Sequence, residues 1–338
     1  MCVIVYNDND VTRIFAIHQI HVNGVRREQS HVFEGRSATT QNGNRRELNH
    51  IEFERPDATQ NHQYVNARDW VFGDGHFSAT DQVWRPSGGC DVHNYTRRDI
   101  RQCLRQRALV TKQDTNIYCI GDSRVRYHLY YIVALVTGEF LDPMIHRDNR
   151  TFSYPRLHFS ATYMASMARH HRRDETYSKL LDKMDKHEIA APSVILTGGA
   201  LHTLSHYNDS IESIAASREA LVHLLPLLNQ LGERSDVIWM LQEPIYREAR
   251  KGGSLRRNYL IHQINHDDID ILQSSAKSGL VHLWRNLGDI TRLFEDPATD
   301  GVHFKGHVIT MQDQLLFNFL CNDYMDFGDQ FCSSSKFK

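Results

Sequence analysis

Residues 116–126 read NIYCIGDSRVR, and this stretch decides the fold class. Residues 116–120 are mostly apolar, as is typical of a buried strand, and Gly121 permits a tight turn after them. A stripe with the three- and four-residue spacing of a packed helix follows, at Val125, Leu129, Ile132, Val133 and Val136. We therefore predict a strand-to-helix turn at 121–123, with Ser123 at the carboxyl end of the strand.

The same alternation of short apolar runs and longer helical stretches continues to the end of the chain. Further strands are predicted at 152–159, 193–197, 236–241 and 280–284. Helices are predicted at 210–231, with a kink at Pro226, and at 255–278 and 306–321. Alternating strands and crossover helices predict an α/β fold, a three-layer α/β/α sandwich with a mainly parallel sheet.

The first part of the chain follows a different pattern. Residues 1–70 are rich in Asn, Arg, Gln, His and Glu, and their short apolar alternations have no sustained period. We interpret 1–70 as an N-terminal extension, 71–325 as the catalytic domain and 326–338 as a C-terminal tail.

Composition excludes several classes of protein. The 338 residues are 41% hydrophobic, which is enough for a full core, and 39 Lys and Arg nearly balance 41 Asp and Glu. Without a broad basic field, nucleic acid is not expected as a partner.

The longest apolar run that could cross a bilayer, 130–136, covers about a third of the length needed. The N-terminus lacks the basic start and the apolar run of a signal peptide. We expect no membrane span and no signal peptide.

Ser123 is the first candidate for chemistry. A serine at the start of a helix has its own backbone N–H and the positive end of the helix dipole beside it, and both stabilise an oxyanion. The competing interpretation is structural, because Asp and Ser before a helix are common N-caps.

The second candidate is the segment Asp300-Gly301-Val302-His303, just before the last predicted helix. In one short loop, His303 can accept the proton of Ser123 while Asp300 orients the imidazole. The chain has 21 His residues, so a single His says little. The serine after the first strand and the Asp-x-x-His before the last helix together predict a Ser–His–Asp triad.

Cysteines and glycosylation sequons point to an oxidising compartment. Cys90 and Cys103 flank a short polar stretch and are predicted to form a disulfide, the alternative being two unpaired thiols. Cys119 is predicted to be a buried free thiol, while Cys2, Cys321 and Cys332 are left open. The sequons begin at Asn94, Asn149 and Asn208, all in polar segments.

The two catalytic motifs resemble those of the PC-esterase branch of the SGNH/GDSL hydrolase superfamily. Within it, the chain looks like the luminal catalytic domains of the sialate O-acetyltransferase family. The segments that carry this likeness are 83–86 (VWRP), 89–90 (GC), 93–95 (HNY), 103–104 (CL), 121–126, 235–246 (SDVIWMLQEPIY), 300–303 and 317–322. The likeness covers about residues 74–323 and is weak over 145–192. It implies an SGNH-hydrolase-like fold and a Golgi or other secretory location.

The resemblance also implies a reaction. Ser123 would take an acetyl group from acetyl-CoA and pass it to a hydroxyl of sialic acid, on CMP-sialic acid or another sialylated glycan, by ping-pong acyl transfer. Acetyl-CoA is then a substrate, and no bound cofactor or metal is expected. His262 and His266 share a helix face, but no third metal ligand is evident. The resembled enzymes carry a many-pass membrane part after this domain, whereas we expect no membrane span within residues 1–338.

One position departs from the superfamily pattern. The Asn that supplies an oxyanion donor after the third strand is replaced by Gly198-Gly199-Ala200-Leu201-His202. Backbone N–H groups of Ser123 and of Gly198 or Gly199 can fill that role, or the glycines only end the strand.

Other residues near the motifs have two interpretations each. Arg124 and Arg126 either bind an anionic substrate or make structural contacts, and Trp84 either lines a sugar pocket or belongs to the core. A triad also suits a carbohydrate acetyl esterase, because water competes for the same acyl-enzyme. A third hypothesis is a non-catalytic glycan-binding domain.

Overall fold

The computed structural model describes residues 2–8, 11–17, 67–78, 83–139, 150–164, 170–245, 254–275, 280–293, 300–304, 306–328 and 330–332. The chain divides into two compact units, Met1–Gln60 and Asn61–Lys338. In the first unit, β1 (Cys2–Asp8) and β2 (Val11–Ile17) form an antiparallel hairpin. The predicted boundary near residue 70 stays a prediction, since residues 18–66 lie outside the described part.

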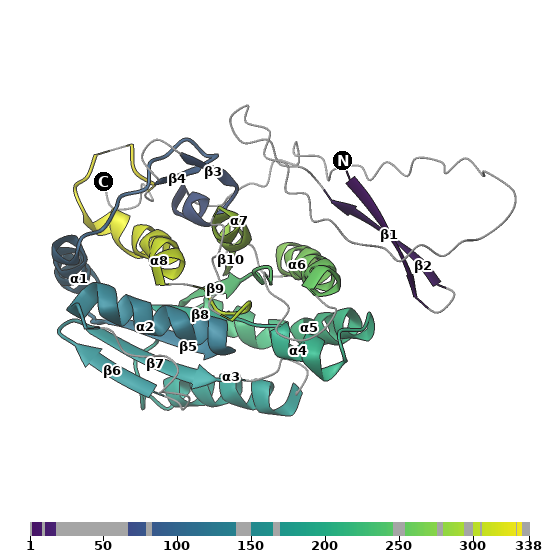
Figure 1. Cartoon of the computed structure of the whole chain (residues 1–338). Coiled ribbons are helices and arrows are strands. Elements are labelled where there is room, and N and C mark those ends of the chain that lie inside the picture. The colour runs from purple at the N-terminus through teal and green to yellow at the C-terminus, as the bar shows by residue number, and fades with distance from the viewer. Residues whose placement is uncertain are drawn as a thin grey trace, which may run out of the picture. The chain divides into compact units, whose positions relative to one another are not determined.

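The second unit is built on a six-stranded sheet with the order β10-β9-β8-β5-β7-β6 (Figure 1). The strands are β5 (Thr115–Gly121), β6 (Arg150–Tyr154), β7 (Leu157–Tyr163), β8 (Val194–Gly198), β9 (Asp236–Met240) and β10 (Val281–Trp284). All neighbours are parallel except the edge pair β6 and β7. The strand order reverses between β5 and β8, and in such sheets ligands bind outside the carboxyl ends of the strands at this point.

The prediction of one strand at 152–159 was wrong. This segment contains the end of β6 and the start of β7, two antiparallel strands. Pro155 lacks the N–H that a continuous ladder needs, and Arg156, with φ of 69°, turns the chain back.

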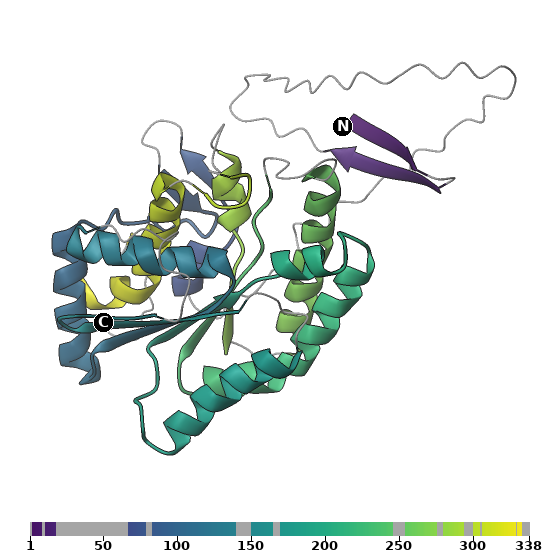
Figure 2. The ribbon, with the colours of Figure 1, turned by 60° about the horizontal axis from the view of Figure 1, so that its bottom comes forward.

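Helices cover both faces of the sheet, and the predicted three-layer α/β/α sandwich is confirmed (Figure 2). The first face packs against α1 (Arg97–Thr111), α2 (Ser123–Thr137), α7 (Leu287–Arg292) and α8 (Gly306–Cys321). The second packs against α3 (His170–Asp185), α5 (Glu212–Gly232) and α6 (Ser254–Ser275). Side chains along β5 alternate between the two faces and so contribute to both cores. Ile117 and Cys119 enter the first core, while Tyr118 and Ile120 face the second.

Shorter elements complete the second unit. They are η1 (Ala67–Phe72), β3 (Gly75–Ser78), β4 (Val83–Pro86), α4 (Leu201–His206) and η2 (Asn322–Tyr324). β3 and β4 form a separate antiparallel pair. None of the described helices combines the length and the apolar character required to cross a bilayer.

The cysteine pairing differs from the prediction. Cys90 does not bond Cys103: the disulfides are Cys90–Cys332 and Cys103–Cys321. Cys103 points from the buried face of α1 toward the end of α8, and Cys90 meets the C-terminal segment through a bridge between Asp91 and Phe331. The prediction for Cys119 is confirmed, since it is a buried free thiol whose pKa is raised by burial.

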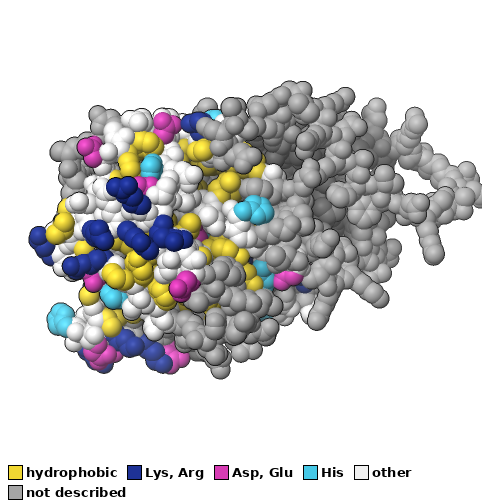
Figure 3. All heavy atoms as spheres, turned by 60° about the vertical axis from the view of Figure 1, so that its left-hand side comes forward, with side chains coloured by type: hydrophobic (Ala, Val, Ile, Leu, Met, Phe, Trp, Pro, Cys, Tyr) yellow, Lys and Arg dark blue, Asp and Glu magenta, His cyan; other side chains and the backbone are white. Residues whose placement is uncertain are grey.

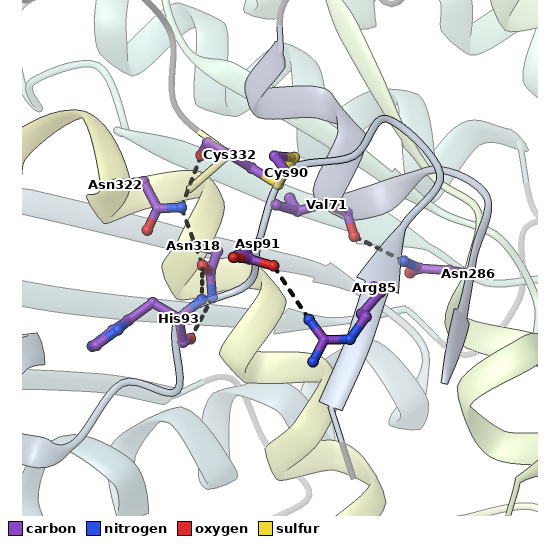
Figure 4. Close-up of a disulfide and its surroundings, with 9 residues drawn as sticks. All are labelled: Val71, Arg85, Cys90, Asp91, His93, Asn286, Asn318, Asn322 and Cys332. Carbon is purple, nitrogen blue, oxygen red and sulfur yellow. Dashed lines mark hydrogen bonds and ion pairs between the residues drawn. A yellow bond between two sulfur atoms is a disulfide. The ribbon is translucent and has the colours of Figure 1, made fainter. Parts of the chain in front are cut away.

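Asn318 of α8 and Asn322 of η2 hold the chain around the first of these disulfides (Figure 4). The Asn318 amide donates to the carbonyl of His93 at 2.8 Å, and its oxygen accepts the His93 N–H at 2.7 Å. The Asn322 amide donates to the carbonyl of Cys332 at 2.8 Å. The C-terminal segment and the irregular segment that precedes α1 are thus both fixed to the continuous stretch formed by α8 and η2.

Candidate active site

Ser123 is the first residue of α2 and is separated from the end of β5 by Asp122 alone. Asp122 is the N-cap of this helix, and its Oδ1 accepts the backbone N–H of Arg124 at 3.0 Å. The N-cap role, which was the competing interpretation of Asp122 and Ser123, is therefore filled by Asp122. The partly exposed hydroxyl of Ser123 is available to another partner.

Glycines line the sheet edge beside Ser123. Gly121 is level with Gly198 on β8, and a Cβ on Gly121 would lie 2.7 Å from the carbonyl oxygen of Gly198. Gly199 has φ of 122°, and a Cβ there would lie 3.1 Å from the Oδ2 of Asp122. The Gly198–Gly199 turn therefore passes close to the start of α2, on the edge that carries Ser123. Its role as an oxyanion donor stays a prediction.

The loop that contains Asp300 and His303 folds around the Asp300 carboxylate. Oδ1 accepts the backbone N–H groups of Val302 at 2.9 Å and of His303 at 2.7 Å. Oδ2 lies 2.7 Å from Nδ1 of the His303 ring. This Asx-type turn fixes the orientation of the imidazole without help from another element.

The structure brings the three predicted triad residues together. Nε2 of His303 lies 2.6 Å from Oγ of Ser123, across 180 residues of sequence. With Nδ1–H donating to Asp300, Nε2 is the nitrogen that accepts the hydroxyl proton. Ser123, His303 and Asp300 thus form one continuous chain of hydrogen bonds.

Electrostatics keep Asp300 ionised. Burial acts to raise its pKa, but the hydrogen bonds from the backbone and ring of His303 and from the backbone of Val302 outweigh it. The net result is a pKa below the ordinary value of 3.8. Asp300 is therefore a carboxylate that can stabilise a protonated His303.

Tyr127 is a site residue that the sequence interpretation missed. Its ring stacks on His303 with centroids 4.7 Å apart and planes 12° from parallel. Tyr127 lies four residues after Ser123, so both side chains occupy the same face of α2. That spacing was the available signal.

Arg124 ties three segments of the site together. Its Nε donates to the carbonyl of Val302 at 3.0 Å, and its terminal nitrogens donate to the carbonyls of Glu243 and Pro244. The guanidinium carbon also lies 4.9 Å from the centre of the Phe304 ring. Of the two interpretations of Arg124, these contacts favour the structural one. They connect α2 to the loop of His303 and to the chain after β9.

Arg126 lies on another side of α2. Its guanidinium carbon is 4.7 Å from the centre of the Tyr163 ring at the end of β7, and the Tyr163 hydroxyl is 3.4 Å from Nε2 of His202. These three side chains stand at the carboxyl edge of the sheet, near Gly121. Trp84, by contrast, is only 3% exposed and belongs to the first core.

A second His–Asp pair is buried below the site. Nδ1 of His128 on α2 lies 2.7 Å from Oδ1 of Asp313 on α8, and their side chains are 2% and 0% exposed. Burial raises the pKa of Asp313 to about 6, although His128 acts to lower it. Sequence patterns did not mark this pair, because its partners lie 185 residues apart.

The remaining predicted sites lie away from the Ser123 region or outside the description. Asn94 and Asn208 are exposed, as glycosylation requires, whereas Asn149 lies outside the described residues. His262 and His266 are on α6, and no group of three His, Cys, Asp or Glu side chains in the described part is placed to hold a metal ion.

Comparison with known proteins shows a similarity to an acetyltransferase. The chain is 23% identical over 279 residues to N-acetylneuraminate (7)9-O-acetyltransferase of Danio rerio. The predicted resemblance to the sialate O-acetyltransferases is confirmed. The match covers 82% of this chain but only 33% of that relative, so the chain spans about a third of the relative's length.

Other comparisons say less. No protein-family model matches the chain. A protein of Parabacteroides merdae described as a GDSL-like lipase covers 62% of this chain at 10% identity, with a TM-score of 0.40 over 96% of its own length. An acetylxylan esterase of Geobacillus stearothermophilus covers 64% at 12% identity, with a TM-score of 0.39 over 96% of its own length. At these TM-scores neither structure bears on the function.

Proposed function

We propose that this protein is a serine-dependent O-acetyltransferase that moves an acetyl group from acetyl-CoA to a hydroxyl of sialic acid. The observation that carries the proposal is the hydrogen-bonded chain of Ser123, His303 and Asp300 at the carboxyl edge of the sheet. The sugar and the acyl group come from the name of the zebrafish relative.

In the first half-reaction, Oγ of Ser123 attacks the thioester carbonyl of acetyl-CoA. Nε2 of His303 takes the hydroxyl proton and gives it to the departing CoA sulfur as the C–S bond breaks. The negative charge that develops on the carbonyl oxygen is stabilised by the backbone N–H of Ser123 at the N-terminus of α2 and by that of Gly198 or Gly199. The products are acetyl-Ser123 and free CoA.

In the second half-reaction, a sugar hydroxyl replaces CoA in the site. His303 accepts its proton, the hydroxyl oxygen attacks the acetyl carbonyl, and the proton returns to Oγ of Ser123 as the acetyl ester of the sugar forms. Asp300 stabilises the imidazolium in both halves. Its lowered pKa supports this role, because the carboxylate stays charged at neutral pH.

CMP-sialic acid is the acceptor we favour among sialylated compounds. Arg126 and His202, which stand at the sheet edge with Tyr163 between them, are the groups suited to an anionic acceptor. Arg124 serves as a positioning residue, since its guanidinium is bonded to three backbone carbonyls.

Hydrolysis is the competing activity. The side chains of Asp300 and His303 are 51% and 18% exposed, so water reaches the triad. The same acetyl-Ser123 would then give acetate, and the protein would act as a carbohydrate acetyl esterase.

The two disulfides are typical of an oxidising secretory compartment. We propose the Golgi lumen as the place of action, and N-glycosylation of the exposed Asn94 and Asn208.

The test is an assay with acetyl-CoA, in the presence and absence of CMP-sialic acid. A transferase releases CoA faster when the acceptor is present and yields O-acetylated sialic acid. Release of CoA that ignores the acceptor and yields only acetate contradicts the transferase and supports the esterase. Ser123→Ala should abolish both products, while Ser205→Ala, at an exposed position of α4, serves as the matched control.

The same variant tests the non-catalytic hypothesis. If Ser123→Ala keeps glycan binding and the wild type turns over neither substrate, the protein is a binding domain. Turnover that Ser123→Ala abolishes excludes that hypothesis.

A further inference from the structure

The outer face of α1 carries a row of arginines. Arg97, Arg98, Arg101 and Arg105, here called the arginine ridge, line an open groove of about 650 Å³ together with Gln102 and Gln106. Figure 3 shows the resulting band of basic side chains across this face of the second unit.

The helix pattern explains why these arginines share one face. Ile100, Cys103 and Leu104 fill the buried face of α1, so Arg97, Arg98 and Arg105 are exposed on the opposite side. Arg101 is half-buried beside them, with its guanidinium carbon 5.6 Å from the centre of the Tyr154 ring. The Cys103–Cys321 disulfide fixes α1 to α8. The ridge is therefore presented by a rigid element.

The ridge has no acidic partner within the described part of the chain. Asp99, the single acidic residue of α1, is bonded to Thr96 in a capping box and lies 3.5 Å from Nε2 of His93. No ion pair joins any described carboxylate to Arg97, Arg98, Arg101 or Arg105. Since the whole chain has a net charge of −2, this concentration of positive charge is local.

The arrangement works against the stability of the free helix. Arg97 and Arg98 lie in the first turn, where the positive end of the helix dipole repels cations. Arg101 is four residues from both Arg97 and Arg105, and like charges at this spacing destabilise a helix. A bound anion would offset these repulsions.

The ridge is separate from the triad. Arg97 lies against Gly138 at the C-terminal end of α2, while Ser123 lies at the other end of that 15-residue helix. The two ends of such a helix are about 20 Å apart. The ridge is therefore a second site and does not depend on the proposed function.

We propose that the arginine ridge binds a linear polyanionic glycan, a chain whose sugars carry repeated sulfate or carboxylate groups. Guanidinium groups pair with these anions through two N–H donors each. Gln102 and Gln106, which alternate with the arginines, supply amides that hydrogen-bond sugar hydroxyls. The disulfides indicate an oxidising compartment, where nucleic acid is not the expected polyanion.

The test uses heparin as the probe and compares two triple variants of the full chain. Arg98→Gln, Arg101→Gln and Arg105→Gln together remove three of the four arginines of the ridge. The matched control, Arg156→Gln, Arg218→Gln and Arg292→Gln, removes the same charge from exposed side chains elsewhere. Thermal unfolding verifies that both variants are folded, and turnover of acetyl-CoA should be unchanged in both.

The wild type should bind heparin with an affinity that falls as salt rises, and the ridge variant should bind about 10-fold or more weakly. The control variant should bind as the wild type does. Equal loss of heparin affinity in both variants, or no loss in the ridge variant, overturns the proposal.

Vesicles of phosphatidylserine and phosphatidylcholine test whether the ridge binds a membrane surface instead, because Leu109 and Val110 are exposed beyond the ridge. Ridge-dependent binding to vesicles that exceeds binding to heparin also overturns it.

Discussion

Two His–Asp pairs in this molecule have the same geometry and opposite surroundings. In both, Nδ1 of the imidazole lies 2.7 Å from a carboxylate oxygen. Asp300 is 51% exposed and accepts two backbone N–H bonds, and its pKa is lowered. Asp313 is fully buried, and its pKa is raised. The distance between the partners therefore does not identify the catalytic pair.

What separates the pairs is the second nitrogen of the ring. Nε2 of His303 reaches Oγ of Ser123 at 2.6 Å, at the point of the sheet where the strand order reverses. His128 of α2 is buried against Asp313 of α8, and its ring lies beside Trp284. Under the proposed function the first pair moves a proton, whereas the second joins two helices.

Removing each histidine should separate the two roles most strongly. His303→Ala is expected to lower turnover by about 10³- to 10⁶-fold, because the base is lost, with little change in the free energy of unfolding. Steady-state kinetics and denaturant unfolding measure the two quantities. A loss below 10-fold would show that His303 is not the base.

His128→Ala should have the opposite profile. It leaves the Asp313 carboxyl buried without its partner, which is expected to cost about 3 kcal/mol of stability. At a temperature where the variant is folded, its turnover should stay within a few-fold of the wild type. Unchanged stability, or turnover as low as that of His303→Ala, contradicts the division of roles.

The pH dependence of stability should differ in sign between the pairs. The folded state keeps a proton on Asp313 up to about pH 6, while the unfolded chain releases it near the ordinary value of 3.8. Stability due to Asp313 therefore falls as pH rises from about 4 to about 6, by up to about 1.4 kcal/mol per pH unit. Asp300, whose pKa is lowered, contributes stability above its ordinary value that is lost as pH falls through the folded pKa.

Asp313→Asn and Asp300→Asn isolate these slopes. The stability of Asp313→Asn should fall less than that of the wild type between pH 4 and pH 6. The free energy of unfolding of Asp300→Asn should be lower than that of the wild type at neutral pH, and this difference should shrink as the pH drops below about 4. Urea unfolding at a series of pH values measures both differences. If the plots of unfolding free energy against pH were parallel for the wild type and the two variants, the opposite pKa shifts given to Asp313 and Asp300 would be contradicted.

Tyr127→Leu should have the smallest effect. It removes the stacking on His303, a contact of about 1 kcal/mol, so turnover is expected to fall two- to tenfold. Tyr118→Leu, a matched loss of a tyrosine on β5, should leave turnover unchanged. Equal losses in the two variants would show that the stacking does not position the imidazole.

Local sequence signals predicted much of the fold. The stripe from Val308 to Phe319 indicated a helix over 306–321, which is the extent of α8, and β5 and β8 lie within a residue or two of their predicted ranges. The signals succeeded because the packed faces of these elements follow a single period. The edge hairpin of β6 and β7 was mistaken for one strand because apolar residues stand on both sides of its turn, although their alternation changes phase between Tyr154 and Leu157.

The contacts that are absent from the sequence prediction join distant segments. The partners of Cys90 and Cys103 are 242 and 218 residues away, so spacing favoured the wrong pairing. Arg124 was a candidate for anion binding by its place beside Ser123, and only the folded chain shows its bonds to Val302, Glu243 and Pro244. Ser123, Asp300 and His303 were found together because two short motifs mark them.

Mass spectrometry of the protein mixed with acetyl-CoA, without acceptor, tests the central claim most directly. Acetyl-Ser123 should accumulate in the wild type, and it should be absent from His303→Ala while still forming in the correctly folded fraction of His128→Ala. An unmodified Ser123 in the wild type, under conditions where CoA is released, would contradict the account.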